Sequence, residues 1–435
     1  MLKRIKGGAD KALGKVKNVK LPVKITESYV VALDIGTENV KALIGRVLRN
    51  GTIEIVGVGK SHQAVTDMQA GAIADISAVT ANCDTALAEA EDQAGMSGTR
   101  VVIGIAGELV KGATHTVRIH RKDPQKPIDD TEFGKMLKLV QSRALEEAKT
   151  ELTKELGGKE VDVRLVNSAL VRIQIDSYDI TNPIGFQGKE VSIQLYTACA
   201  PMIHIGALER VAEMLDLDLL AVAAEPFAVS RAILGNDDNN KTSAILMDVG
   251  GGTTDIAVVN EGGVMGTKMF GIGGRAFSRS IERDMGVTYT QAEAIKLGLT
   301  DGRVPKQKIP AVEASLKKTL NVWSSGVQIA LDDFNAETLP HRLLLCGGGS
   351  SLDMLVDDLQ ESNWYKELPF TKKPFIHHIQ PTEVSGITDT TDTINDHTFI
   401  TAMGLLRVGA DTLTTNNMTG SGRSFKDKVN KLLKV

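Results

Sequence analysis

The sequence predicts an α/β fold of two related lobes, with an α+β segment inserted into the first lobe. Of its 435 residues, 42% are apolar and 24% charged, enough for about two to four hydrophobic cores. Apolar strand patterns end at Asp34 and again at Asp248, and after each aspartate a glycine turn leads straight into another strand. Helical patterns follow both of these modules.

The first module is an expected meander of three strands. The run Tyr29 to Leu33 ends at Asp34-Ile-Gly36-Thr37, an apolar run resumes from 40 to 47, and Gly51 opens a third strand. Residues 75–94 have helical spacing, with Gly95 as the stop. We assign the first lobe to 28–98 and 193–240.

A different pattern interrupts this lobe. Residues 101–106 are strand-like, 131–156 form a long charged helical stretch, and strand patterns return at 161–175 and 189–197. We expect an inserted subdomain over 99–192.

The second module repeats the first 214 residues later, counted from Asp34 to Asp248. It reads Asp248-Val-Gly250-Gly251-Gly252-Thr253-Thr254-Asp255 and returns as a strand at 256–259. Helices are expected at 275–298, 308–335, 352–361 and 397–409. The second lobe is assigned to 241–271 and 340–410, with a helical subdomain at 272–339.

Charge is distributed unevenly along the chain. Residues 1–24 carry +7 and residues 423–435 carry +4, whereas the whole chain carries −4, which leaves −15 for the body. An acidic body argues against nucleic acid as a partner. We expect a basic amphipathic N-terminal extension over 1–27, either a second lipid contact or a disordered basic tail.

The C-terminal end has the pattern of an interfacial membrane anchor. After a flexible linker predicted at 411–423, the apolar residues of 424–435 fall on one helical face with lysines around it. Such a helix binds anionic lipid reversibly. Docking on the chain's own domain is the alternative. The residues expected to contact the membrane are Phe425, Val429, Leu432 and Leu433.

Other classes of protein are disfavoured. The three cysteines are widely spaced, without a Cys/His cluster, and no apolar run approaches the roughly 18 residues of a membrane-spanning helix. We find no signal peptide, and a reducing cytosol is expected.

The glycine turns indicate a phosphate site. Free amide groups of such a turn bind anions, and glycine lets the backbone approach closely. Since a strand and not a helix follows each turn, neither a dinucleotide fingerprint nor a Walker loop is present. Two turns facing each other could hold one polyphosphate, with Asp34 and Asp248 holding a hydrated Mg²⁺. For either turn alone, a tight hairpin is the alternative.

These motifs resemble the actin superfamily of two-lobed (ribonuclease H-like) ATPases. The turn at Asp34 matches its first phosphate motif, the turn at Asp248 its second, and Leu345-Cys-Gly-Gly-Gly-Ser350 its adenosine motif. The resemblance implies that Glu293-Ala-Ile-Lys296 contacts the ribose and that Glu225 is catalytic, close to the attacking water. It implies that Mg·ATP is bound by Asp34, Gly36, Thr37, Asp248, Gly250, Gly251, Gly252, Thr253, Thr254, Gly274, Glu293, Lys296, Gly347, Gly348, Gly349 and Ser350.

Within the superfamily the chain resembles the bacterial division family FtsA over roughly 28–435. The runs 102–107, 182–188, 271–274, 292–296 and 402–406 follow the FtsA pattern in order. This resemblance implies ATP-dependent protofilaments at the cytoplasmic face of the membrane at the septum. It also implies binding to the C-terminal tail of the tubulin-like protein FtsZ, to an anionic lipid surface and to later division proteins.

Slow ATP hydrolysis is expected, because the motifs offer no lysine of the Walker type. Two alternatives stay open. A PilM-type pilus-assembly platform also has an inserted subdomain, and a small-molecule kinase uses the same superfamily cleft. The basic amphipathic C-terminus favours FtsA over the former, and no sequence feature identifies the acceptor pocket that the latter needs.

Overall fold

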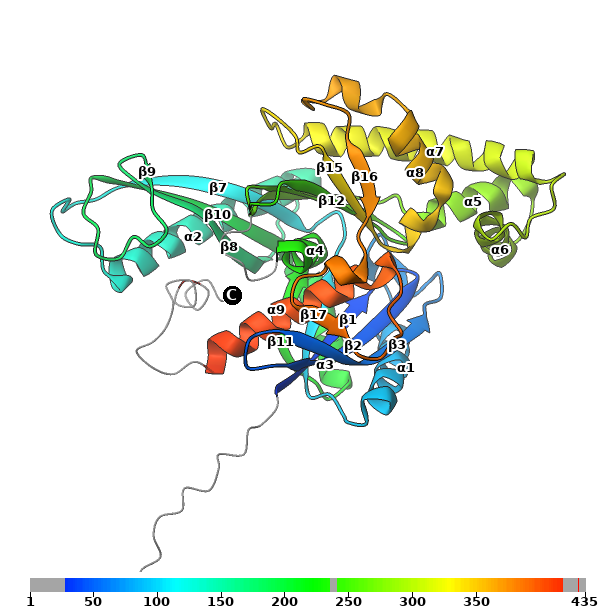
Figure 1. The fold of residues 1–435 in the computed structure, drawn as a ribbon, viewed down its shortest axis with the longest axis horizontal. Helices are drawn as coiled ribbons and strands as arrows, with labels where there is room; N and C mark the ends of the chain where they lie inside the picture. Colours follow the sequence, from blue (N-terminus) through cyan, green and yellow to red (C-terminus); the bar gives the residue numbers. More distant parts are fainter. Residues whose placement is uncertain (1–27, 235–240, 418–428, 430–435) are drawn as a thin grey trace, which may run out of the picture.

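The computed structural model describes residues 28–234, 241–417 and Val429 (Figure 1). Two sheets form the centre of the two lobes, and a third unit projects from the side of the second sheet. Within the described part of the chain, no helix is long and apolar enough to cross a membrane.

The first sheet has six strands in the order β11-β6-β1-β2-β3-β17. The expected meander is present as three antiparallel strands, and the other three strands add in parallel. The strands are β1 (Ser28–Ile35), β2 (Asn39–Val47), β3 (Ile53–His62), β6 (Arg100–Ile105), β11 (Asp218–Ala224) and β17 (Ile387–Asp389).

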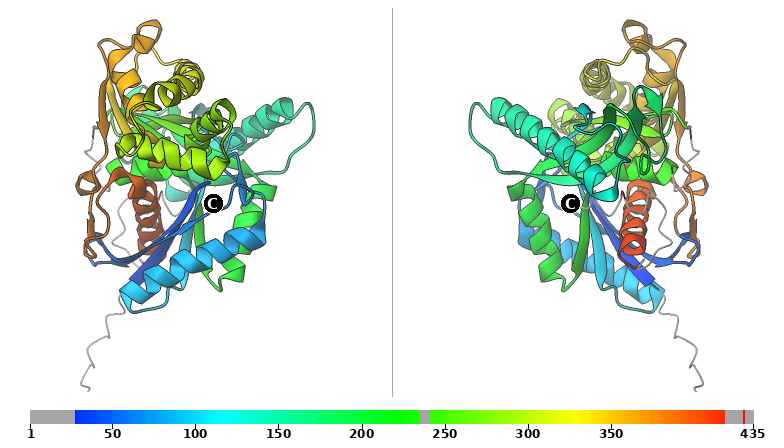
Figure 2. Two further views of the ribbon diagram at one scale, coloured as in Figure 1. Left: turned by 90° about the vertical axis from the view of Figure 1, so that its right-hand side faces the viewer. Right: turned by 90° about the vertical axis from the view of Figure 1, so that its left-hand side faces the viewer.

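Helices cover both faces of this sheet. Helix α1 (Ile76–Ala94) begins at Asp75, whose carboxylate accepts a hydrogen bond from the Ala78 amide, and ends at Gly95 in the left-handed conformation. It packs with α3 (Met202–Met214) on one side of the sheet, and α9 (Ile400–Asn417) lies on the other (Figure 2).

The second sheet has nine strands in the order β16-β15-β12-β13-β14-β7-β10-β8-β9. Its first five strands come from the second lobe and its last four from the inserted segment. The strands are β16 (Phe375–His378), β15 (Arg342–Cys346), β12 (Ala244–Val249), β13 (Thr254–Asn260), β14 (Gly263–Phe270), β7 (Lys111–His120), β10 (Glu190–Pro201), β8 (Val163–Ile175) and β9 (Tyr178–Asp179). A separate hairpin pairs β4 (Met68–Gln69) with β5 (Ala72–Ile73).

The two parts of this sheet join through a short pairing of β14 with β7. Gly266 pairs with Ala113, and Thr267 pairs with Gly112. A Cβ at Gly112 would lie 2.0 Å from Thr267 Oγ1, so only glycine lets the strands approach here. The inserted subdomain is therefore hydrogen-bonded to the second lobe, although the chain inserts it into the first.

Helices also surround the second sheet. In the inserted subdomain α2 (Asp130–Glu155) packs on β7, β8 and β10. The second lobe contributes α5 (Gly274–Met285), α6 (Tyr289–Thr300), α7 (Ile309–Asp332) and α8 (Asp353–Glu361). Short 3-10 turns are η1 (Gly348–Ser351), η2 (Trp364–Glu367), η3 (Pro381–Glu383) and η4 (His397–Phe399). Helix α4 (Glu225–Leu234) packs against α9 and against strands of both sheets, and so connects the lobes.

Several predicted boundaries differ from the structure. Strand β6 belongs to the first sheet, so the insertion starts after Ile105 and not at 99, and β10 carries it to Pro201. Strand β17 and helix α9 pack on the first lobe, although we assigned 340–410 to the second. Helix α9 continues to Asn417, so the linker prediction is wrong for 411–417. The Thr- and Asn-rich composition of this segment has weak helix propensity, but Leu413 is buried in the core of the first lobe, and such packing overrides local propensity.

Other predictions lie outside the described residues. These are the N-terminal extension 1–27, the rest of the linker at 418–423, and the membrane-contact residues Phe425, Leu432 and Leu433.

Candidate functional site

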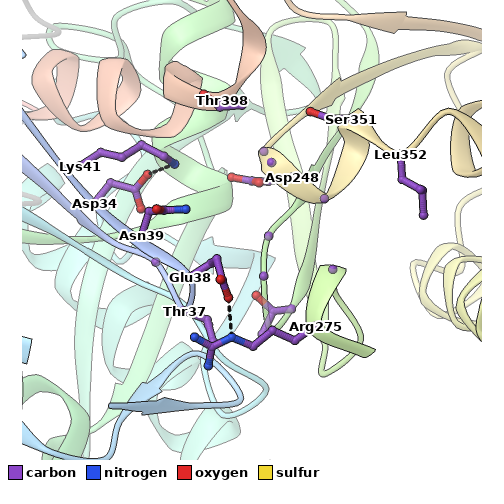
Figure 3. A pocket seen from close by; sticks show the side chains of 18 of the residues that line it. Asp34, Thr37, Glu38, Asn39, Lys41, Asp248, Arg275, Ser351, Leu352 and Thr398 are labelled. Atoms are coloured by element: carbon purple, nitrogen blue, oxygen red, sulfur yellow. Dashed lines mark hydrogen bonds and ion pairs between the residues drawn. The ribbon is translucent and has the colours of Figure 1, made fainter. Parts of the chain in front are cut away.

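A cavity of about 570 Å³ lies between the lobes, within the range of roughly 300–1,000 Å³ typical of small-molecule sites. Its walls come from the turn after β1, the turn after β12, the start of α4, helices α5 and α6, and the glycine run after β15 (Figure 3). The two glycine turns predicted to face each other are therefore brought together.

The first turn carries an ion pair. Asp34 is the second-last residue of β1 and lies directly opposite Lys41 on β2, and Lys41 Nζ donates to Asp34 Oδ2 at 2.8 Å (Figure 3). Burial alone lowers the pKa of Lys41, but Asp34, helped by Asp248 and Glu225, raises it above the ordinary value. Lys41 thus stays protonated and presents a cation to the cavity.

The second turn contributes two buried carboxylates. Asp248, at the end of β12, accepts a hydrogen bond from the Thr401 hydroxyl, and Asp255 accepts one from Thr253 Oγ1 at 2.9 Å. Burial, followed by the charge of Asp248, raises the pKa of Asp255 to about 8. Asp255 Oδ1 is buried and has no partner among the described residues. An unsatisfied buried carboxylate oxygen indicates that a ligand or water completes the site.

Glu225 enters the same cavity from the first residue of α4. Its carboxylate has room because Gly104 lies beside it; a Cβ there would be 2.8 Å from Glu225 Oε1. Burial raises the pKa of Glu225 well above its ordinary value, and the charges of Asp34, Asp255 and Asp248 raise it further.

A divalent cation would favour the charged forms of the acidic groups in this cavity, because burial and their mutual repulsion raise the pKa values of Glu225, Asp248 and Asp255. Four buried carboxyl groups, those of Asp34, Glu225, Asp248 and Asp255, line the cavity together with one half-buried lysine, Lys41. Among residues 28–234 and 241–417 no three Asp, Glu, His or Cys side chains converge closely enough to ligate a metal directly. Asp34 and Asp248 are the carboxyl groups that could hold the waters of a hydrated Mg²⁺, an ion that keeps several waters and takes phosphate oxygens as ligands.

The glycine run after β15 forms the wall opposite the first turn. Gly347 has φ +81°, and a Cβ on it would lie 1.9 Å from Asp248 Oδ1, so no other residue fits. Lys296 Nζ also lines the cavity, and it donates to Glu293 Oε2 at 2.9 Å and to the Gly274 carbonyl at 3.1 Å. Glu293 and Lys296 therefore form an i, i+3 ion pair on α6 and at the same time line the cavity.

Two histidines lie next to the glycine run that follows β15. The rings of His378 and His397 stack with centroids 4.1 Å apart, and the Ser351 hydroxyl lies 3.1 Å from His397 Nε2. Burial, followed by His378, lowers the pKa of His397 to about 4.

A salt bridge crosses the mouth of the cavity. Arg275, in the first turn of α5, donates through Nε to Glu38 Oε2 at 2.7 Å, and its guanidinium also donates to the carbonyls of Gln63, Ala64 and Val65 at 3.3–3.4 Å (Figure 3). The two side chains are only 11% and 22% exposed. One strong contact therefore links the second lobe to the first phosphate turn.

Most of the predicted site residues line the cavity. They are Asp34, Gly36, Thr37, Glu225, Asp248, Gly250, Gly251, Thr253, Gly274, Glu293, Lys296, Gly347, Gly348 and Gly349.

Three predicted residues do not line it. A Cβ at Gly252 would lie 2.7 Å from Thr37 Oγ1, so this glycine spaces the two turns. The Thr254 hydroxyl donates to the Ile272 carbonyl and accepts from the Trp323 indole. The Ser350 hydroxyl donates to the Gly347 carbonyl. The last two therefore stabilise the fold around the site.

Sequence reasoning missed Lys41, Asp255, Glu38 and Arg275 as site residues. Lys41 had a usable signal, because a two-strand meander places it opposite Asp34. It also weakens our reason for expecting slow hydrolysis, since a lysine does face the cavity. Arg275 had no such signal, because its partner Glu38 is 237 residues away.

Val429, one of the residues predicted to contact the membrane, is buried against protein in this structure. This side chain is only 2% exposed and belongs to the apolar cluster of the inserted subdomain. In this structure Val429 does not lie free for lipid, because it packs on protein instead.

The chain is similar to one family of known proteins. The family profile described as "Cell division protein FtsA" matches residues 245–404. The chain is 25% identical over 405 residues to the cell division protein FtsA of Neisseria meningitidis, covering 87% of this chain and 90% of that protein. It is 24% identical over 423 residues to FtsA of Pseudomonas aeruginosa, covering 91% and 93%. The resemblance predicted from the sequence is confirmed.

A solved structure shows the same fold. The structure titled "PilM-PilN type IV pilus biogenesis complex" matches with a TM-score of 0.64 and 14% identity, covering 88% of this chain and 98% of that one. The two-lobed actin-like fold predicted from the sequence is thereby confirmed.

Proposed function

Because the chain is related to the FtsA cell division proteins and has an actin-like ATPase fold, we propose that it is an ATP-dependent, self-assembling protein that tethers the FtsZ ring to the membrane. The observation that carries the nucleotide part is the cavity in which two glycine turns, four carboxylates and Lys41 converge. Phosphates would lie between the turns, and adenosine would lie between the glycine run at 347–349 and the pair Glu293 and Lys296.

Each charged residue has a proposed role. Asp34 and Asp248 would hold the waters of Mg²⁺, which supplies charge neutralisation to the phosphates. Lys41 would contact a phosphate oxygen as a point charge. Glu225, buried beside the turns, would position the attacking water and accept its proton.

Nucleotide would act mainly as a switch. Both glycine turns must close on the same phosphates, and the Arg275–Glu38 salt bridge then links the lobes at the cavity mouth. Closure of this kind favours one relative orientation of the lobes, which is the orientation that assembly into protofilaments would select.

The parts of the chain outside the two central lobes would bind the partners. We propose that the helical subdomain at 272–339 binds the C-terminal tail of FtsZ, that the inserted subdomain contacts other division proteins or copies of the chain, and that the basic segment 424–435 binds anionic lipid at the septum. Along a protofilament, weak anchors add up to strong attachment.

Electron microscopy on an anionic lipid monolayer with Mg·ATP tests the proposal. The full chain should form filaments, and a chain ending at residue 422 should not. Asp248→Asn should abolish filaments while leaving the protein folded. Filaments without nucleotide would contradict the switch, and filaments from the shortened chain would contradict the C-terminal anchor.

A binding assay then tests the partner. A synthetic peptide of the FtsZ C-terminal tail should bind the full chain, and a pilin-assembly peptide should not. The reverse result would overturn the division role and leave the nucleotide site intact.

A further inference from the structure

Val429 lies in an unexpected place for a residue near the end of a basic tail. It is 2% exposed and packs in one apolar cluster with side chains of the inserted subdomain. That cluster includes Phe133, Leu137 and Val140 of α2, Val117 of β7, Ile173 and Ile175 of β8, and Val191, Ile193 and Leu195 of β10.

We propose that the inserted subdomain is a docking site for the chain's own C-terminal segment, seated through Val429, and that docking and lipid binding exclude each other. The second half rests on the proposed membrane role. The first half does not, since it needs only the packing of Val429.

Chain length allows docking within one molecule. Helix α9 ends at Asn417, twelve residues before Val429. Twelve residues span at most about 40 Å when extended. Strand β11 packs against both α9 and β8, so the last helix and the subdomain that buries Val429 share a neighbouring strand.

The sequence explains why the two states compete. Val429 is the second of four apolar residues spaced for one helical face in 424–435. The residue that would enter the lipid interface is the residue that the subdomain buries. One apolar side chain cannot be buried in both places, so lipid must displace it from the protein.

Docking of the C-terminal segment would regulate the protein in addition to nucleotide. Away from a membrane, the apolar face would be kept out of water, which limits aggregation. At an anionic surface, the lysines of the segment would favour release. The inserted subdomain would thereby change its exposed surface at the moment when the chain binds the membrane.

Thiol accessibility tests the docking in the full chain. Val429→Cys, measured without lipid, should react with a maleimide at least about tenfold more slowly than Leu139→Cys, because a buried thiol reacts only after local opening. Leu139 is the matched control, being a large apolar residue of α2 that is 41% exposed. The native thiols Cys83, Cys199 and Cys346 are buried and add little background. Equal rates for the two variants would overturn the docking.

Varying the protein concentration shows whether the docked segment belongs to the same chain or to a second copy. If the introduced thiol of the Val429→Cys variant stays equally protected from about 0.1 to 10 μM, the result supports docking within one chain. Protection that disappears on dilution would assign the seat to a second copy's tail and overturn the proposal.

Vesicles test the exclusion. Hydrogen exchange of α2 should become faster when the full chain sediments with phosphatidylglycerol vesicles, whereas exchange of α1 should not change. Val429→Asp should produce the faster α2 exchange without vesicles, with an unchanged circular dichroism spectrum. Unchanged α2 exchange in vesicle-bound protein would overturn the exclusion. A protected thiol in a Val429→Cys chain that does not bind vesicles would support the docking and contradict the membrane role instead.

Discussion

The salt bridge between Arg275 and Glu38 should control how fast nucleotide leaves. Its Nε to Oε2 distance is 2.7 Å, it is largely buried, and it joins α5 of the second lobe to the first phosphate turn. Opening the cavity must break it. A hydrogen bond to a charged group contributes about 1.5–3 kcal/mol, which corresponds to a rate change of about 10- to 150-fold.

Arg275→Ala should therefore release a fluorescent ATP analogue about 10- to 150-fold faster in stopped-flow displacement. Arg279→Ala is the matched control, because Arg279 lies one turn further along the same helix and is 57% exposed in a local pair with Glu282. It should change the rate less than about twofold.

A double-mutant cycle separates a latch from a direct phosphate contact. If the salt bridge holds the lobes closed, Glu38→Gln should also speed release, though less than Arg275→Ala because the bonds to the carbonyls of Gln63, Ala64 and Val65 remain, and the double variant should add little to Arg275→Ala. If Arg275 acts only on phosphate, Glu38→Gln should leave release unchanged or slow it. That second pattern would refute the reasoning.

Three further predictions follow from packing and charge. Gly112→Val should lower the free energy of unfolding in urea by about 1–3 kcal/mol, because its side chain meets Thr267 Oγ1 at the joint of the nine-stranded sheet; Gly206→Ala, with open space around it, should not. Thr254→Val should lower the free energy of unfolding by about 1–3 kcal/mol, because it leaves the Trp323 N–H unpaired. The affinity for ATP should stay the same. A loss of affinity would show that Thr254 belongs to the binding site. The pKa of half-buried His397 is lowered to about 4, so its contribution to stability is complete above about pH 6.5 and is lost as pH falls toward 4, because the unfolded chain takes up the proton first. The urea midpoints at pH 7 and pH 5 should therefore differ less in His397→Gln than in the unchanged protein. An equal drop of the midpoint in both proteins would contradict the assignment.

Local patterns predicted the core of the fold because they report short-range geometry. The meander after Tyr29 and the helix ending at Gly95 depend on alternation and capping within a few residues. The cavity followed from the two glycine turns, whose chemistry is also local.

Long-range pairing could not be predicted in the same way. The addition of β17 to the first sheet and of β7 to the second depends on contacts between segments far apart in the chain. Arg275 looks like an ordinary helix residue until the fold brings Glu38 to it. The burial of Val429 belongs to the same class, because an amphipathic pattern specifies an apolar face without specifying what covers it.

The joint between β14 and β7 gives the inserted subdomain two different attachments. Its peptide chain enters from β6 and leaves into α3, which are both on the first lobe, while its sheet is hydrogen-bonded to the second lobe at Gly112 and Thr267. If the lobes rotate about the cavity, as the proposed switch requires, these attachments cannot both stay fixed. The subdomain would then tilt against one of them, and its orientation would report the angle between the lobes to any partner bound on the outer surface.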